Sequence, residues 1–120
     1  MSYSYFLIFP IIIRLGSVAV LFIHIFLVRV SMKVSIVIPV YNESKTICDV
    51  ITRVEEAIDN KEIIIVDDNS TDGTRDLLLK YEGKKDFKVI YQPKNKGKGA
   101  ALRAGFDVAK GEIIIVQDAD

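Results

Sequence analysis

The stretch Glu62–Gly73 reads Glu-Ile-Ile-Ile-Val-Asp-Asp-Asn-Ser-Thr-Asp-Gly, in which four apolar residues give way abruptly to polar residues and glycine. A run of β-branched residues without alternation is typical of a central parallel strand that is covered on both faces. The Asp, Asn, Ser and Gly residues that follow favour a turn and the start of a helix. Ligands of open α/β sheets bind at the carboxyl ends of such strands. The stretch therefore predicts a parallel α/β sheet with its functional site at this edge.

Two other predicted strands end in polar residues in the same way. Glu112–Val116 leads into Gln117–Asp120, and Val34–Pro39 leads into Tyr41–Glu43. A single acid after a strand is most often a turn residue or a helix cap. Three strands that bring polar side chains to one edge favour a binding site over that simpler interpretation.

The spacing of apolar residues predicts helices between the strands. The predicted strands span residues 34–39, 62–67, 87–91 and 112–117, and the predicted helices span residues 44–58, about 72–83 and 100–109. In the last helix, Leu102, Phe106 and Ala109 are expected to face inward. Strands that alternate with helices over short connections predict a three-layer α/β fold with a mostly parallel sheet and right-handed crossovers.

The charge balance and the cysteine count limit the kinds of site that the chain can hold. The 120 residues hold 16 basic and 16 acidic side chains, so the overall charge gives no argument for nucleic-acid binding. Cys48 is the single cysteine, which excludes an internal disulfide and a multi-cysteine zinc site. It falls near the apolar face of the first predicted helix, so we expect a core thiol.

Residues 1–31 differ in composition from the predicted domain, residues 32–120. The region from Tyr5 to Val28 is apolar but contains Pro10 and Arg14, and its longest uncharged run is fourteen residues, whereas a spanning helix needs about 20. Three interpretations stay open: a membrane anchor, a cleaved signal peptide, or a natural start at Met32. The signal peptide is the least favoured, because no basic segment precedes the apolar run. We expect the segment to pack little against the domain and to be helical where it is ordered.

The loop Lys94–Gly99 carries three lysines and two glycines just ahead of a predicted helix. Backbone N–H groups and the helix dipole favour an anion at such a position, so a phosphate site is one interpretation. A solvated basic loop is the other. The spacing of Gly97 and Gly99 fits neither a P-loop nor a dinucleotide-binding fingerprint.

The sequence Asp118-Ala119-Asp120 directly follows the last predicted strand. Residues two apart in an extended chain face the same way, so the two carboxylates are expected to lie together. Such a pair suits Mg²⁺ or Mn²⁺, which prefer oxygen ligands and would in turn hold the phosphates of a nucleotide.

Four motifs in order along the chain carry a resemblance to a known family. They are Ser35-Ile-Val-Ile-Pro-Val-Tyr-Asn-Glu43, Ile65-Val-Asp-Asp-Asn-Ser-Thr-Asp-Gly73, Asn95-Lys-Gly-Lys-Gly-Ala-Ala-Leu-Arg-Ala-Gly105 and Gln117-Asp-Ala-Asp120. From Lys33 to Asp120 the chain resembles family 2 glycosyltransferases with the GT-A fold, and most of all the dolichyl- or polyprenyl-phosphate mannose synthases.

The resemblance implies a Rossmann-like GT-A domain that binds a nucleotide sugar, with the first strand between the second and the fourth. It implies a GDP- or UDP-hexose donor, with mannose from GDP-mannose as one candidate, a polyprenyl phosphate acceptor and Mg²⁺ or Mn²⁺. It also implies an inverting reaction in the cytoplasm or at the cytoplasmic face of a membrane. The residues implied to contact the nucleotide sugar are Pro39, Tyr41, Glu43, Val66, Asp68, Asp118, Ala119 and Asp120, of which Asp118 and Asp120 would also hold the metal and act in catalysis.

Members of the family continue beyond the motif at Asp118–Asp120 with an acceptor-binding half. We therefore expect this chain to supply the N-terminal, nucleotide-binding half and to transfer no sugar alone. A nucleotide-binding remnant without catalysis is an alternative, as is a remnant that binds nothing. A phospho-receiver signalling domain is disfavoured, because its acid pair follows the first strand whereas Asp67 and Asp68 follow the second.

Overall fold

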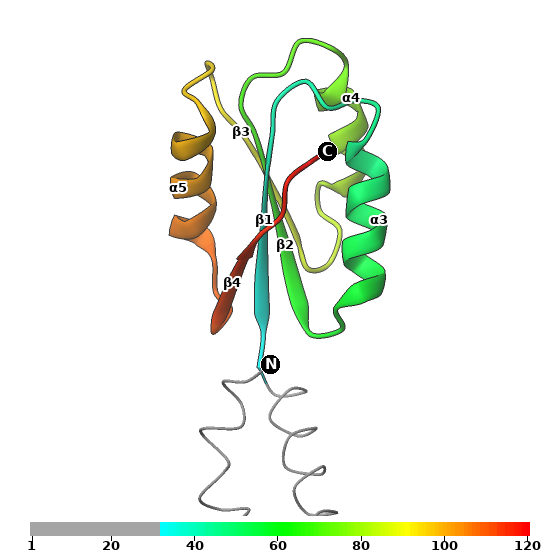
Figure 1. Cartoon of the computed structure of the whole chain (residues 1–120), viewed down its shortest axis with the longest axis vertical. Coiled ribbons are helices and arrows are strands. Elements are labelled where there is room, and N and C mark those ends of the chain that lie inside the picture. Colours follow the sequence, from blue (N-terminus) through cyan, green and yellow to red (C-terminus); the bar gives the residue numbers. More distant parts are fainter. Residues whose placement is uncertain (1–31) are drawn as a thin grey trace, which may run out of the picture. The chain divides into compact units, whose positions relative to one another are not determined.

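The computed structural model describes residues 32–120, which form an α/β domain around a four-stranded sheet (Figure 1). The strands are β1 (Val34–Val40), β2 (Lys61–Asp67), β3 (Phe87–Tyr91) and β4 (Ile113–Val116). All pairings are parallel and the spatial order is β3-β2-β1-β4. The expected parallel sheet, with the first strand between the second and the fourth, is confirmed.

Helices cover both faces of the sheet (Figure 1). They are α3 (Ile47–Ala57), α4 (Thr74–Leu78), the 3₁₀ helix η1 (Leu79–Tyr81) and α5 (Lys98–Val108). α3 and α4 lie on one face and α5 lies on the other, which gives the predicted three layers. α3 begins later than the predicted Ser44, because the backbone N–H of Ser44 is held in a loop by Asp72 (3.1 Å).

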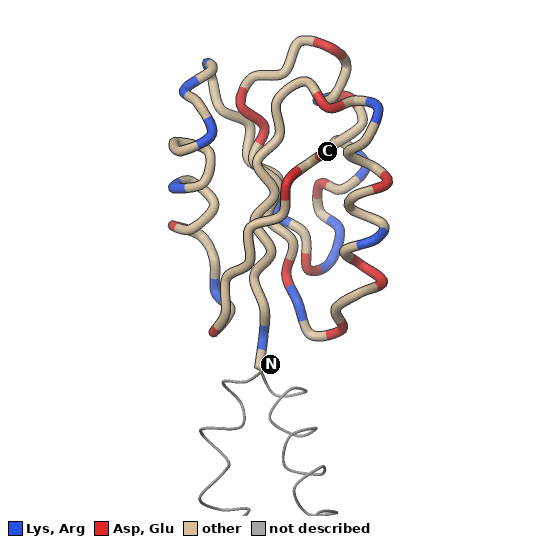
Figure 2. Tube along the Cα trace, in the orientation of Figure 1, with Lys and Arg blue, Asp and Glu red and all other residues tan. Residues whose placement is uncertain are grey.

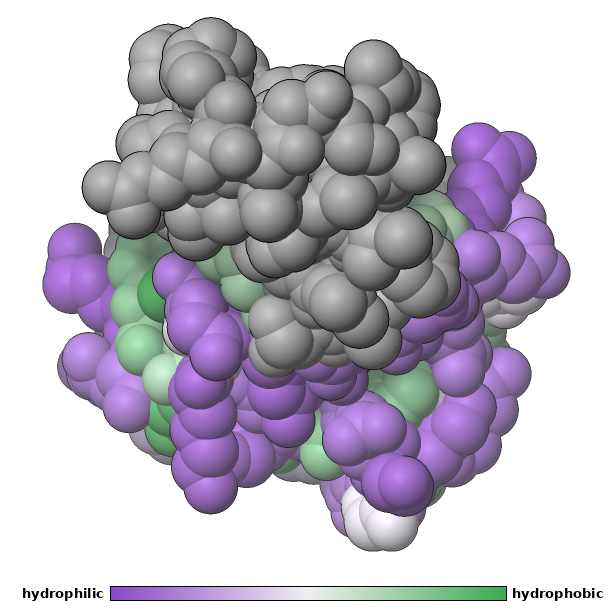
Figure 3. Space-filling view, turned by 90° about the horizontal axis from the view of Figure 1, so that it is seen from below, coloured by the Kyte–Doolittle hydropathy of each residue, from purple (hydrophilic) through white to green (hydrophobic). Residues whose placement is uncertain are grey.

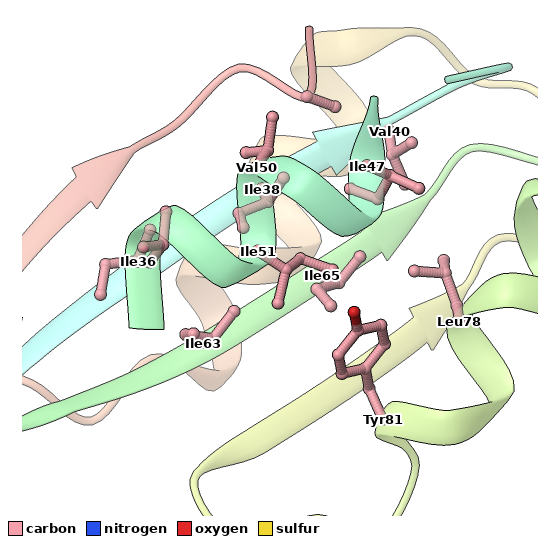
Figure 4. Close-up of a cluster of buried hydrophobic side chains, with 12 residues drawn as sticks. Ile36, Ile38, Val40, Ile47, Val50, Ile51, Ile63, Ile65, Leu78 and Tyr81 are labelled. Atoms are coloured by element: carbon pink, nitrogen blue, oxygen red, sulfur yellow. The ribbon is translucent and has the colours of Figure 1, made fainter. Parts of the chain in front are cut away.

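A large apolar cluster lies between the sheet and α3 (Figure 4). Alternate residues of β1 and β2 point into it, including Ile36 and Ile38 from β1 and Ile63 and Ile65 from β2. The residues between them point to the opposite face, where Ile64 packs in a smaller cluster against α5. β2 is therefore buried on both faces, as its unbroken apolar run predicts.

α5 approaches the sheet closely where its residues are small. A Cβ atom at Gly105 would overlap the side chain of Val37, and Ala101 is fully buried in the same cluster. Phe106, predicted to face inward, is instead 40% exposed. Each helical residue is rotated about 100° from the one before, so a helix that turns Gly105 toward β1 turns Phe106 away.

A buried polar network joins α5 and β4 to the amino ends of the central strands. The Ser35 hydroxyl donates to the Glu62 carboxylate (2.5 Å), which also accepts the backbone N–H of Lys110 (2.5 Å). The N–H of Gly111 in turn donates to the Ser35 hydroxyl (2.8 Å). The molecular face at this end, seen from below, is mostly hydrophilic where the described residues are visible (Figure 3).

The interpretations made for residues 1–31 lie outside the described residues. Within residues 32–120, none of the helices has the length and apolar character needed to cross a membrane.

Candidate functional site

A cavity of about 360 Å³ opens at the carboxyl ends of β1 and β4 and reaches the residue that follows β2. Acidic residues gather on the loops at this end of the sheet, and basic residues follow one another along α5 and the loop before it (Figure 2). The cavity is lined by Pro39, Val40, Tyr41, Glu43, Asp68, Asn95, Gly97, Lys98, Ala101, Asp118, Ala119 and Asp120. The expectation that Asp68 and Asp118 share a cleft is therefore confirmed.

The structure places every residue that the resemblance singled out at this cavity, with one exception. Val66 is fully buried in the cluster against α5 and does not line the cavity. It lies inside β2, where alternate side chains point into one core or the other rather than toward the strand end. The Val66 side chain therefore does not border the cavity, and the predicted contact of Val66 with a nucleotide sugar stays a prediction.

The loops that follow β1 and β2 are tied to each other. The backbone N–H of Asn42 donates to the Ser70 hydroxyl (2.9 Å), and the N–H of Thr71 donates to the Asn42 side-chain oxygen (2.7 Å). Asn42 and Asn69 have φ angles of 52° and 64°, a left-handed conformation that asparagine tolerates better than most residues. These contacts fix the loop that carries Glu43 to the cavity.

Two of the acids that follow the apolar run of β2 serve the fold rather than the cavity. The buried Asp67 accepts the Arg75 side chain (2.5 Å) and the backbone N–H of Ser70 (3.2 Å). Asp72 accepts both the hydroxyl (2.5 Å) and the N–H (3.0 Å) of Thr74. The hydrogen bond from the Thr74 hydroxyl is the main cause that holds the pKa of Asp72 far below its usual range. Of the three acids in the Glu62–Gly73 stretch that follow the apolar run, only Asp68 lines the cavity.

Asp68 holds the loop between β3 and α5. One carboxylate oxygen accepts the backbone N–H of Lys96 and the other accepts that of Gly97, each at 2.8 Å. Gly97 has a φ angle of 88°, which favours glycine, and α5 begins at the next residue. Sequence reasoning missed this contact, because Asp68 and Gly97 are far apart in the chain.

The segment Asp118–Asp120 is fixed from two sides. The N–H of Gln117 continues the pairing with β1 through the Val37 carbonyl (3.0 Å), and the Thr46 hydroxyl donates to the Ala119 carbonyl (2.6 Å). All three residues of the segment line the cavity, and Ala119 is also buried in the core beside α3. The two carboxylates are therefore on the same cavity, as their spacing predicts.

A lysine of this chain contacts the first of these carboxylates. The Lys98 ammonium, on the first residue of α5, donates to Asp118 (2.6 Å), and both side chains are 60% exposed. The hydrogen bond from Lys98 to Asp118, together with the charges of Asp118 and Asp120, raises the pKa of Lys98. The lysines of the loop Lys94–Gly99 led to the interpretation of a phosphate site. In the structure, the anion that Lys98 contacts is the carboxylate of Asp118.

The donor groups in the cavity fit a hard divalent cation that is shared with a ligand. Among residues 32–120, no group of three or more His, Cys, Asp or Glu residues is placed to hold a metal ion by itself. Asp118 and Asp120 supply carboxylate oxygens only. Mg²⁺ is typically bound in this way, through one or two carboxylates with substrate phosphates and water completing its shell.

The parallel sheet and the acidic cavity at its carboxyl edge define a GT-A-like α/β domain. Residues 35–120 match the family described as Glycosyl transferase family 2. The chain belongs to this family.

Curated relatives and solved structures agree with this assignment. The chain is 40% identical over 91 residues to dolichol-phosphate mannosyltransferase of Pyrococcus furiosus, covering 74% of this chain and 26% of the relative. It is 43% identical over 94 residues to undecaprenyl-phosphate 4-deoxy-4-formamido-L-arabinose transferase of Aeromonas hydrophila, covering 72% and 28%. The mannosyltransferase PcManGT of Pyrobaculum calidifontis, solved with GDP-Man and Mn²⁺, superposes with a TM-score of 0.64 at 30% identity, covering 72% and 27%. The chain thus spans about a quarter of the length of these proteins.

Proposed function

We propose that this chain is the nucleotide-sugar-binding part of a metal-dependent, inverting glycosyltransferase that transfers a hexose to a polyprenyl phosphate. The observation that carries the proposal is that one cavity joins Glu43, Asp68, Asp118 and Asp120 at the carboxyl edge of the sheet. The names of the relatives, a dolichol-phosphate and an undecaprenyl-phosphate transferase, support the class of acceptor. GDP-mannose is the first donor to test, because it is the ligand of the solved archaeal neighbour.

The chain's residues divide into two roles under this proposal. Pro39, Tyr41 and Glu43 form the wall that would contact the nucleoside, and Asp68 lies at the base of the cavity where it holds the loop before α5. Asp118 and Asp120 would hold Mg²⁺ or Mn²⁺ beside the diphosphate. When bound, the ion would neutralise the charge that develops on the departing nucleoside diphosphate.

The proposed acceptor needs little help from a general base. A polyprenyl phosphate already carries an anionic oxygen, so the protein must align this oxygen with the sugar carbon rather than remove a proton. As the family resemblance implies, we propose that the reaction takes place in the cytoplasm or at the cytoplasmic face of a membrane. A localisation experiment on the tagged protein checks this placement.

The direct test is calorimetric titration of the full chain with GDP and UDP, with and without Mn²⁺. We expect binding that collapses when the metal is chelated, because two carboxylates near one diphosphate repel it unless a cation lies between them. Asp120→Asn should lose about 10-fold or more of the metal-dependent affinity. Asp68→Ala should weaken binding with and without metal, because it releases the loop that borders the cavity. Asp107→Asn, which removes the same charge from the exposed side of α5, is the matched control.

Two results would contradict the proposal. Nucleotide binding that is independent of Mn²⁺ and indifferent to Asp120→Asn would remove the metal-binding role of Asp118–Asp120. Absence of binding by either nucleotide, at millimolar concentrations and with Mn²⁺ present, would favour the remnant that binds nothing.

A further inference from the structure

Lys98 belongs to the third sequence motif and lines the cavity, but the resemblance assigns it no role. Its ammonium contacts Asp118 at 2.6 Å, and Lys98 lines the cavity together with Asp118 and Asp120. The cation therefore lies among the same carboxylates that would hold a divalent ion. In the described part of the chain, it is the only lysine or arginine that lines the cavity.

The place of Lys98 is set by the loop before it. Asp68 accepts the N–H groups of the two preceding residues, Lys96 and Gly97, at 2.8 Å each. Gly97 then turns the chain with a positive φ angle of 88°, and Lys98 starts α5. The backbone of Lys98 is thus held at the cavity wall through Asp68, while its long side chain extends into a largely exposed position.

The contact itself is suited to exchange. Both side chains of the Lys98–Asp118 pair are 60% exposed, and exposed ion pairs contribute little to stability because water competes for both groups. A divalent ion carries twice the charge and approaches a carboxylate more closely than an ammonium does. It can therefore replace Lys98 at Asp118 at little cost to the fold.

We propose that Lys98 is a tethered cation that balances Asp118 and Asp120 until a divalent ion takes its place, and that it then turns to the diphosphate of the nucleotide. A lysine side chain suits this exchange because it is a flexible point charge with three donors that commonly binds phosphates. The second half of the proposal rests on the function proposed above. The first half concerns only the ion and the carboxylates.

The test separates the two halves. Mn²⁺ alone is titrated into the full chain and free Mn²⁺ is followed by electron paramagnetic resonance, comparing wild type with Lys98→Met, Lys98→Arg and Lys96→Met. Lys98→Met should bind Mn²⁺ about three- to tenfold more tightly, because a competing charge is removed. Lys98→Arg should stay within about twofold of wild type, since it keeps the charge. Lys96→Met should also bind Mn²⁺ within about twofold of wild type. It removes an exposed charge from the same loop but keeps the backbone N–H that donates to Asp68.

GDP and UDP are then titrated in saturating Mn²⁺. Lys98→Met should bind both about five- to tenfold more weakly than wild type, so that one substitution strengthens ion binding and weakens nucleotide binding. If Lys98 had only a structural role, its replacement would weaken both Mn²⁺ binding and nucleotide binding, or neither. Unchanged or weaker Mn²⁺ binding by Lys98→Met overturns the proposal, and so does the absence of Mn²⁺ binding by every variant. If wild type binds Mn²⁺ but no nucleotide, the proposed function fails and the Mn²⁺ titration alone decides whether Lys98 balances the carboxylates.

Discussion

β2 and β4 have nearly the same sequence and opposite surroundings. Glu62-Ile-Ile-Ile-Val-Asp67 and Glu112-Ile-Ile-Ile-Val-Gln117 differ only in the last residue. The four apolar residues of β2 are fully buried, whereas those of β4 are 40–45% exposed. β2 pairs with β1 and β3, while β4 pairs with β1 alone among the described strands. Burial of an apolar strand is therefore set by its place in the sheet and by the layers that cover it, which the strand's own residues do not encode.

The largest expected difference between the two strands is in the cost of removing a core side chain. Ile64 and Ile114 lie at equivalent positions and both point to the α5 face, as the register with Val37 and Ser35 shows. Ile64→Ala should lower the free energy of unfolding by about 3–4 kcal/mol, because it leaves a cavity in a closed core. Ile114→Ala should cost less than about 1 kcal/mol, because nearly half of Ile114 is still exposed to water.

Urea denaturation of the full chain measures both substitutions. If Ile64→Ala fails to fold, the valine variants give the same comparison. Ile64→Val should then lower the free energy of unfolding by about 1 kcal/mol, and Ile114→Val by a few tenths of a kcal/mol. Equal losses at the two positions would show that β4 is covered in solution, and would contradict the different burial of β2 and β4.

A smaller difference is expected at the one residue that distinguishes the two sequences. Asp67 is fully buried and accepts the Arg75 side chain, whereas Gln117 is only partly buried. Asp67→Asn should destabilise the chain by about 2 kcal/mol. This is less than the cost of removing one partner of a fully buried ion pair, because Arg75 is partly exposed and can be hydrated. Gln117→Ala should change stability by less than about 0.5 kcal/mol. Chemical denaturation at neutral pH checks the pair, and an Asp67→Asn variant as stable as wild type would contradict the structural role of this acid.

The sequence was sufficient for the elements and their order. The β3 boundaries match the prediction, β1 and β2 differ from it by one residue at one end, and β4 differs by one residue at each end. β-Branched runs bounded by turn residues mark strands clearly. The parallel pairing followed from the alternation of strands and helices, and the strand order came from the family resemblance. The prediction that Asp68 and Asp118 line the same cavity followed from the positions at which β2 and β4 end.

The sequence was not sufficient for contacts that depend on how layers meet. Phe106 was assigned to the core from helical spacing, but Gly105 allows the helix to approach β1 and turns Phe106 outward. Val66 was assigned to the site from its motif, although strand alternation directs it into the core. The contact between Lys98 and Asp118 joins residues from two elements, and only the packing of α5 beside β4 brings them together. The nucleotide and metal assignments stay predictions until they are measured.

The smallest expected difference is between the glutamates that begin the two sequences. Glu62 is buried and accepts the Ser35 hydroxyl and the Lys110 N–H, whereas Glu112 is exposed and accepts the N–H of Lys33 (2.6 Å). Glu62→Gln should cost about 1 kcal/mol at pH 7, because the amide keeps one oxygen acceptor but loses the charge that strengthens both hydrogen bonds. Glu112→Gln at pH 7 should cost a few tenths at most.

The pH dependence of this cost identifies its origin. Burial opposes ionisation of Glu62, but the hydrogen bonds from Ser35 and Lys110 and the charges of Lys33 and Lys88 outweigh it and lower the pKa of Glu62. A carboxyl group whose pKa is lower in the folded state contributes stability above its unfolded pKa of about 4.3, and this stability is lost as the pH falls through the folded value. The difference in unfolding free energy between wild type and Glu62→Gln should therefore be constant from pH 7 to about 5 and shrink below about 4. Ser35→Ala should reduce the size of this change, because it removes one of the hydrogen bonds that lower the pKa. A difference that grows with acidification would mean that burial prevails and that the pKa of Glu62 is raised.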